Sequence, residues 1–202
     1  VSGYYKTSND VGVFGRISFL IFIVVLGIES ARQTVARLKK GRRAEELEQF
    51  ALNDSMTGMY NRNAYDYFVK NEKDFEGYVI VTFDLNNLKQ CNDQYGHRAG
   101  DEYIINAAHI IEDNFERYGK CYRIGGDEFC CIIPKGRYFK IERVMHKIDQ
   151  DVEILNHKNI IPVPVGIAYG YAVFTADDTD PEKVRERADQ DMYRNKKTMK
   201  QS

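Results

Sequence analysis

The 202-residue chain is long enough for one domain with a sizeable core and a further segment beside it. Its 43% hydrophobic and 29% charged residues are typical of a globular protein, and its 29 basic residues balance 30 acidic ones. This balance argues against a nucleic-acid partner, because proteins that bind polyanions usually carry a clear basic excess. Four cysteines, none in a CxxC pair, indicate reduced thiols in a cytosolic domain rather than zinc ligands or disulfides.

Residues 11–28 are apolar apart from Arg16, and residues 17–28 carry no charged side chain. With Arg16 reaching toward an interface, the apolar zone 11–28 approaches the roughly 20 residues that a bilayer span requires. Basic residues are concentrated after this zone, which predicts a membrane segment in residues 1–29 with the rest of the chain in the cytoplasm, at the inner membrane. An apolar helix buried in a dimer interface is the alternative. The basic residues are Arg32, Arg37, Lys39, Lys40, Arg42 and Arg43.

Residues 30–52 are charged and helix-favouring. Their apolar residues form a stripe at spacings of three and four that slips near Gly41, and they are Ala31, Val35, Leu38, Ala44, Leu47 and Ala51. This pattern predicts a coiled-coil signalling stalk that dimerises, with a solvated linker helix as the alternative. Because residue 1 is Val rather than Met, we expect a piece of a longer or processed protein with an unknown upstream sensor domain.

Residues 53–202 show the alternating helix and strand patterns of a globular domain. Strands are expected at 78–83, 122–124, 129–133 and 165–173, and helices after Leu88, from Asp101 to 115, from 141 to 152, and from Pro181 to about Lys200. The strand 165–173 has only Gly and Ala at its even positions, so another element should pack closely on that face. The order of elements predicts an α+β fold with a mainly antiparallel sheet covered by helices.

Three carboxylates carry the chemistry suggested by these elements. Asp84 follows the buried apolar strand, and Asp127 and Glu128 lie in the glycine hairpin. We expect them to lie together, and such a cluster requires cations to neutralise it. Oxygen ligands select Mg²⁺ or Mn²⁺, and two such ions with a nucleoside triphosphate suit in-line phosphoryl transfer.

Four sequence blocks resemble the GGDEF family, the diguanylate cyclases. They are Asp54–Arg62 (DSMTGMYNR); Phe83–Lys89 (FDLNNLK) with Asn92-Asp93, Gly96-His97 and Gly100-Asp101; Arg123–Phe129 (RIGGDEF); and Ala188–Tyr193 (ADQDMY) with Lys196. The resemblance covers about residues 52–200. It implies a palm-like sandwich of the nucleotide-cyclase or polymerase-palm type, here preceded by a long N-terminal helix. It also implies a homodimer that condenses two GTP into cyclic di-GMP and two pyrophosphates. A catalytically silent domain that binds GTP as a regulatory module is the alternative.

The resemblance assigns roles to individual residues. Mg²⁺ would be held by Asp84, the carbonyl of Leu85, Asp127 and Glu128, and the catalytic residues would be Asp127, Glu128 and Lys89. The triphosphate would meet the N–H groups of Asn87 and Leu88, the glycines Gly125 and Gly126, and the ammonium groups of Lys89, Lys196 and Lys200. Guanine would be selected by Asn92 and Asp101, since a carboxylate can accept both the N1–H and the exocyclic amine of the base.

Other matched residues have structural interpretations. Asp54, Arg62 and Asp189 are expected in buried or interfacial salt bridges, His97 in a turn, and Tyr122, Phe129 and Tyr193 in the core. The sequence departs from the family pattern at Asn86, Leu88 and Lys200, where Asp, Phe and Arg are common. It also has Glu116 and Gly119 in place of the family's Arg-x-x-Asp product site, so we predict that product inhibition through that site is absent.

Overall fold

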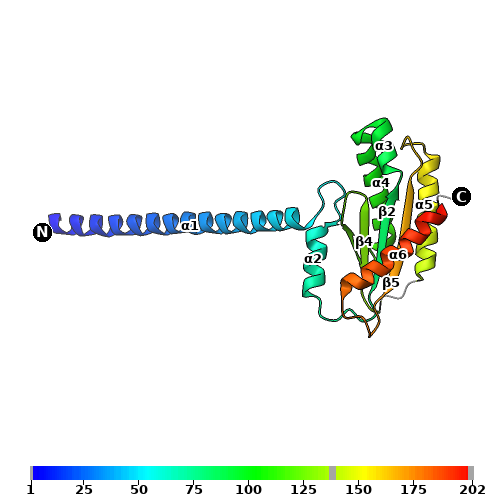
Figure 1. The fold of residues 1–202 in the computed structure, drawn as a ribbon. Helices are drawn as coiled ribbons and strands as arrows, with labels where there is room; N and C mark the ends of the chain where they lie inside the picture. The colour runs from blue at the N-terminus through cyan, green and yellow to red at the C-terminus, as the bar shows by residue number, and fades with distance from the viewer. Residues whose placement is uncertain (1, 137–139, 200–202) are drawn as a thin grey trace. The chain divides into compact units, whose positions relative to one another are not determined.

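A computed structural model describes residues 2–136 and 140–199, with no side chains described at 2–14, 38, 40–50, 198 and 199 (Figure 1). The chain divides into two compact units, residues 1–49 and 50–202. The first consists of most of helix α1 (Ser2–Leu52). The second contains the other helices and a five-stranded sheet.

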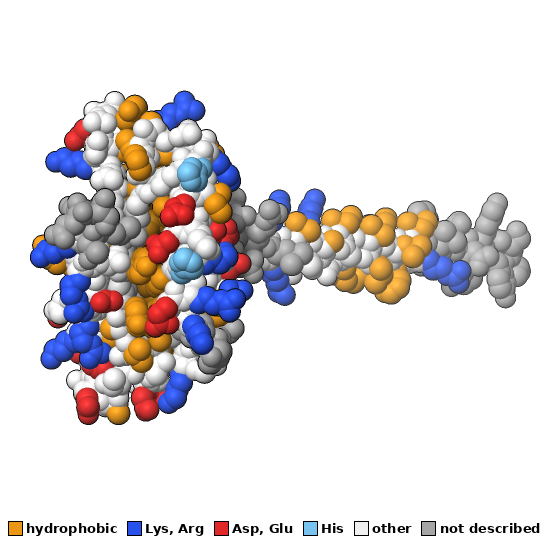
Figure 2. Space-filling view, turned by 90° about the vertical axis from the view of Figure 1, so that its right-hand side faces the viewer, with side chains coloured by type: hydrophobic (Ala, Val, Ile, Leu, Met, Phe, Trp, Pro, Cys, Tyr) orange, Lys and Arg blue, Asp and Glu red, His pale blue; other side chains and the backbone are white. Residues whose placement is uncertain are grey.

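Helix α1 presents its apolar residues outward. All residues from Gly15 to Arg37 are exposed, and an 18-residue window within this 23-residue stretch has a mean hydropathy of 1.6. Figure 2 shows its apolar side chains as a band along the helix, with Lys or Arg side chains on both sides of the band. By length and composition the helix could cross a membrane, although a signal sequence would have the same properties.

The coiled-coil stripe is described at three positions. Ala31, Val35 and Ala51 are exposed, whereas the side chains of Leu38, Ala44 and Leu47 lie outside the described residues. The stalk therefore stays a prediction.

The sheet has the strand order β1-β3-β4-β2-β5, so β2 is central. Its strands are β1 (Tyr60–Asn61), β2 (Val79–Asn86), β3 (Lys120–Arg123), β4 (Glu128–Ile133) and β5 (Gly166–Val173). The pair β1–β3 is parallel and the other three pairs are antiparallel. This arrangement confirms the predicted α+β class with a mainly antiparallel sheet.

Helices cover both faces of the sheet (Figure 1). They are α2 (Arg62–Asn71), α3 (Leu88–Tyr95), α4 (His97–Phe115), α5 (Ile141–His157) and α6 (Pro181–Met199). Neighbouring residues of β2 enter different cores, since Val81 packs with α4 and α5 while Ile80 packs with α2 and α6. This alternation follows from the two-residue period of a strand and explains why residues 78–83 form a nearly continuous apolar run.

The strongly periodic helices form where the sequence predicts them. In α4 the predicted buried positions Ile104, Ala108 and Ile111 are at most 6% exposed, although the helix begins at His97 rather than Asp101. In α6 the Asp180 carboxylate accepts the N–H of Glu182 at 3.0 Å, as expected of a cap. Helix α2 was not predicted; the Asn61 side chain caps it by accepting the N–H of Ala64.

The expected close packing on β5 is confirmed at Gly170. A Cβ there would lie 2.0 Å from the backbone nitrogen of Met192 and 2.4 Å from the carbonyl oxygen of Ala188, both on α6. The helix backbone therefore rests directly on the strand. Tyr122 and Phe129 are core residues, each 1% exposed.

The expectation that Tyr193 is a core residue is wrong. Its side chain is 57% exposed, and the Lys197 ammonium lies 4.4 Å from its ring centroid. Tyr193 comes five residues after the buried Ala188, a spacing that turns it away from the packed face of the helix.

Side chains of α6 also bind the backbone of β5. The N–H groups of Tyr169 and Tyr171 donate to Asn195 and Asp191, each at 3.3 Å, and Arg187 donates to the carbonyl of Val173 at 2.9 Å. Because β5 is the last strand of the sheet, these contacts satisfy backbone groups on its outer edge.

Candidate active site

The central strand and the hairpin bring two predicted metal ligands opposite each other. Asp84 and Glu128 are register partners in the β2–β4 pair, and the N–H of Leu85 donates to the carbonyl of Asp127 at 3.0 Å. β2 continues to Asn86, so Asp84 lies within the strand rather than at its end. The hairpin backbone is thus attached to β2 beside both carboxylates.

A lysine from the last helix reaches this position. The Lys196 ammonium forms an ion pair with the Asp84 carboxylate, and the two side chains are 26% and 16% exposed. α6 is held on β5, so it delivers a cation to an acid 112 positions earlier in the chain. Lys196 therefore lies beside a predicted metal ligand.

The predicted cluster of three acids is less compact than expected. Within the described ranges, no group of three or more His, Cys, Asp and Glu side chains is placed to hold a metal ion. The oxygens of Asp84 and Glu128 are nevertheless the ligand type that Mg²⁺ and Mn²⁺ prefer. The donor chemistry fits a hard cation, and the full ligand set stays a prediction.

The predicted phosphate loop follows β2 directly. Asn87 adopts a left-handed conformation, with φ of 62°, and α3 begins at the next residue, Leu88. The first N–H groups of a helix lack partners within it and attract anions. The side chains of Asn87 and Lys89 are exposed, consistent with access for a ligand.

The two guanine-selecting candidates lie on packed helices. Asn92 is on α3, and a Cβ at residue 100 would lie 2.0 Å from its side-chain oxygen. Gly100 therefore allows the Asn92 side chain to approach α4 closely. Asp101 follows Gly100 on α4 and is exposed. The structure thus places Asn92 against the segment of α4 that carries Asp101.

The hairpin glycines have different surroundings. Neither is among the described glycines with positive φ, so a left-handed turn does not require them. A Cβ on Gly125 would lie 3.1 Å from the Glu128 carboxylate, whereas one on Gly126 would meet open space. Gly125 therefore leaves room for Glu128. Lys200 lies outside the described residues.

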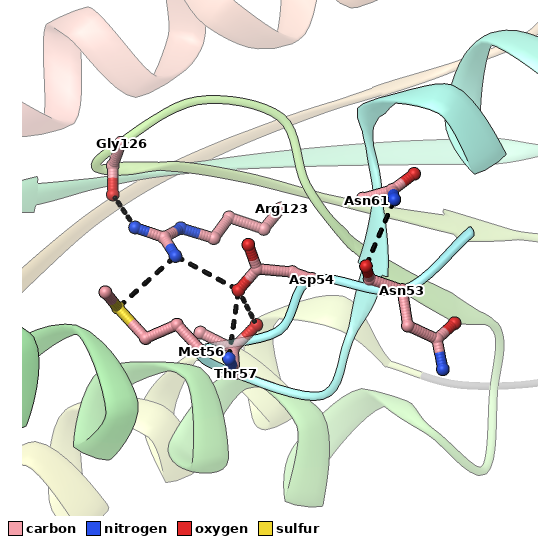
Figure 3. Close-up of polar contacts among 7 residues, drawn as sticks. All are labelled: Asn53, Asp54, Met56, Thr57, Asn61, Arg123 and Gly126. Carbon is pink, nitrogen blue, oxygen red and sulfur yellow. Dashed lines mark hydrogen bonds and ion pairs between the residues drawn. The ribbon is translucent and has the colours of Figure 1, made fainter. Parts of the chain in front are cut away.

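Arg123 links the turn after α1 to the hairpin, a role that the sequence reasoning missed (Figure 3). Its guanidinium contacts the Asp54 carboxylate at 3.0 Å and the carbonyl of Gly126 at 2.8 Å. Asp54 also accepts the N–H and hydroxyl of Thr57, at 2.9 and 2.8 Å. Burial alone would raise the pKa of Asp54, but the hydrogen bonds from Thr57 and Arg123 hold it below the ordinary value.

The predicted salt bridges have mixed outcomes. The Asp54 pair is confirmed, with side-chain exposures of 11% for Arg123 and 23% for Asp54. Asp189 lies 3.6 Å from Arg185, and its pKa is raised by burial. Arg62 instead pairs at the surface, 3.9 Å from Asp66. His97 is the exposed first residue of α4 and directly follows Gly96, which has a positive φ.

Comparison with known proteins identifies the family. The family described as "Diguanylate cyclase, GGDEF domain" matches residues 51–202, and the chain belongs to this GGDEF family. It is 30% identical over 172 residues to the bifunctional diguanylate cyclase/cyclic di-GMP phosphodiesterase MucR of Pseudomonas aeruginosa, covering 81% of this chain and 24% of MucR. It is 28% identical over 158 residues to the diguanylate cyclase DgcS of Shewanella oneidensis, covering 75% of this chain and 52% of DgcS.

A solved structure has the same fold. The coiled coil and GGDEF domain of DgcB from Caulobacter crescentus, crystallised with c-di-GMP, matches with a TM-score of 0.71 and 23% identity. The match covers 86% of this chain and 95% of that one. The present chain spans about a quarter of MucR and half of DgcS, so it corresponds to a part of each.

Proposed function

We propose that the chain is a diguanylate cyclase, which condenses two GTP into cyclic di-GMP and two pyrophosphates as a homodimer. The observation that carries the proposal is that Asp84 and Glu128 are register partners beside a hairpin whose backbone is hydrogen-bonded to β2. Lys196, delivered to the same point by α6, supports it with a cation suited to phosphate. Membership of the GGDEF family supports the substrate class.

The reaction assigns a task to each part of the site. Each ribose 3′-oxygen forms a bond to the α-phosphorus of the other GTP, and the bond from that phosphorus to pyrophosphate breaks. Asp127 accepts the hydroxyl proton, which passes on to water. Asn92 and Asp101 hold the guanine, while the first N–H groups of α3 with Lys89, Lys196 and Lys200 hold the phosphates. Since one GTP cannot close the ring, two chains must face each other.

Mg²⁺ or Mn²⁺ fits the oxygen ligands of Asp84, the Leu85 carbonyl, Asp127 and Glu128. When bound, such an ion neutralises phosphate charge and lowers the pKa of the attacking hydroxyl. With the ion bound to Asp84, the Lys196 ammonium would pair with a terminal phosphate instead of the Asp84 carboxylate. Lys196 would therefore have an anionic partner both with and without the ligand.

The proposed setting is a membrane. The exposed apolar residues 17–28 of α1 would span the inner membrane with Arg16 at the interface, and the basic residues from Arg32 onward would remain in the cytoplasm with the catalytic domain. The stalk would set the distance between the two domains and so relay an upstream input. An arginine at the centre of a span costs about 2.5–3.5 kcal/mol. Ile23→Arg should therefore shift the protein from the membrane to the soluble fraction, whereas Val35→Arg should not. Equal retention of both variants would contradict the anchor.

The activity is tested by incubating the full chain with GTP and Mg²⁺ and identifying the products by chromatography and mass. We expect cyclic di-GMP and pyrophosphate, at least 100-fold reduced in Glu128→Gln. The matched control is Glu116→Gln, an exposed glutamate at the end of α4. A verified dimer that binds GTP but forms no cyclic di-GMP would contradict the cyclase assignment.

That last outcome would support the alternative, a GGDEF domain that binds GTP as a regulatory module. One observation favours it, namely that Asp84 is paired with Lys196, and among the described residues it is not grouped with two further acids that could hold a metal ion. Binding and turnover measured on the same preparation separate the two functions.

A further inference from the structure

A buried tyrosine connects α4 to the last residue pair of the β2–β5 ladder. Tyr103 is 0% exposed, and its hydroxyl donates to the carbonyl of Asn86 at 2.6 Å. The same hydroxyl accepts the N–H of Gly166 at 2.7 Å. Asn86 and Gly166 are register partners, so one side chain from a helix holds both strands where their pairing ends.

The carbonyl that Tyr103 binds lies at the entrance to the phosphate loop. Asn86 is the last residue of β2, Asn87 has a left-handed backbone, and Leu88 begins α3. Fixing the Asn86 carbonyl fixes the peptide plane that leads into this turn, because that plane is rigid. The direction of the first N–H groups of α3 depends on it.

The helix that carries Tyr103 also carries the guanine-selecting segment. Asp101 lies two residues earlier, and Gly100 makes the close approach to Asn92. Asp101 on α4 is therefore linked to the phosphate loop through the Tyr103 hydroxyl, in addition to the packing of α4 on α3 at Gly100. No charge is involved, and burial raises the pKa of Tyr103, so the hydroxyl remains a donor at any assay pH.

We propose that Tyr103 is a positioning residue that sets the distance between the guanine-binding and the phosphate-binding halves of the GTP site. The inference rests on the proposed function and deepens it. A ligand that bridges both halves gains from their fixed spacing, because its second contact becomes intramolecular. A ligand that touches one half does not. Loss of the hydroxyl should thus affect GTP and leave its fragments bound as before.

The test compares Tyr103→Phe with Tyr65→Phe. Both tyrosines are buried, but the Tyr65 hydroxyl has no hydrogen-bond partner among the described residues. Removing it therefore breaks no hydrogen bond to any of these residues. Calorimetry with Mg²⁺ should show GTP binding weakened about 10-fold in Tyr103→Phe. The affinities for guanosine and for pyrophosphate should stay within twofold of the wild type. Tyr65→Phe should bind all three normally.

A second variant guards against misfolding of the first. Gly166→Ala keeps Tyr103 but places a Cβ 3.2 Å from that of Asn86, which should push the same pair apart and give the same selective loss. Unchanged GTP affinity in folded Tyr103→Phe, or equal weakening of all three ligands, would overturn the inference.

The outcome for the proposed function is separate. A wild type that binds GTP but makes no cyclic di-GMP refutes the cyclase assignment, and the ligand comparison still decides the role of Tyr103. A wild type that binds no GTP overturns both.

Discussion

The two strands beside β2 are held to the rest of the domain in different ways. The β3–β4 hairpin is held by Arg123, which joins Asp54 to Gly126 through partly buried charged contacts. β5 is held at two points by neutral contacts, Gly170 against the backbone of α6 and Tyr103 across its first residue pair, and the charged side chains Arg187 and Asp191 bind only its outer edge. Charged links respond to pH and salt and can break locally, whereas packed neutral contacts are lost with the fold. The β3–β4 hairpin, which carries Asp127 and Glu128, is therefore the part whose position can change without unfolding the domain.

The largest expected effect comes from disrupting the neutral packing of β5 on α6. In Gly170→Ala the new Cβ would lie 2.0 Å from the Met192 nitrogen, and backbone cannot yield as a side-chain tip would. Overpacking of this kind costs about 3 kcal/mol of unfolding free energy. Urea denaturation would measure it, with Gly126→Ala as the control, since a Cβ there meets open space. Equal midpoints for the two variants would refute the close-packing argument.

A smaller effect is expected on the charged side. Arg123→Lys keeps the charge but cannot contact Asp54 and Gly126 together, because an ammonium lacks the fork of a guanidinium. We expect about 1–2 kcal/mol lower stability and about 10-fold lower cyclase activity from a misplaced hairpin. Arg62→Lys is the control, because Arg62 pairs with Asp66 at the exposed surface. If both variants keep full activity, Arg123 does not position the hairpin.

The same comparison shows what sequence alone could predict. Elements with strong periodicity, such as α4 and α5, were located from their buried residues. Helix α2 was missed because it is short, at 10 residues, and only Ala64 and Tyr65 are buried in it. Tyr193 was misplaced because an aromatic residue in a matched motif suggests core, while helical phase decides the face it occupies.

The sequence predicted which residues belong to the candidate site, but not which of them lie opposite each other. Motifs indicated that Asp84, Asp127 and Glu128 lie together, yet the register that sets Asp84 opposite Glu128 depends on how the hairpin docks on β2. Contacts such as Arg123 with Asp54, 69 positions apart, exist only once the sheet has formed. The hydroxyl of Tyr103 has no sequence signal, since a buried tyrosine in a helix is usually a packing residue.

The charged link should also depend on pH. Because the folded-state pKa of Asp54 lies below the ordinary 3.8, its carboxylate stabilises the fold fully well above that value. The stabilisation is lost as the pH falls through the lower folded-state pKa. Asp54→Asn should therefore be less stable than the wild type at pH 7, and the gap should narrow as the pH falls below 3.8. Thermal unfolding from pH 7 to pH 3 checks this, and a gap that stays constant would contradict it.

The smallest expected effect concerns the outer edge of β5. Asp191→Ala removes the acceptor for the N–H of Tyr171, which water can replace at an exposed edge. We therefore expect about 0.5–1 kcal/mol of destabilisation, and the same from Asn195→Ala. The double variant would leave two edge N–H groups open to strand pairing, so it should self-associate at high concentration in light scattering. Glu186→Ala, on the same helix and exposed, should change neither property. A double variant as soluble as the wild type would show that the packing of α6 protects this edge without the two side chains.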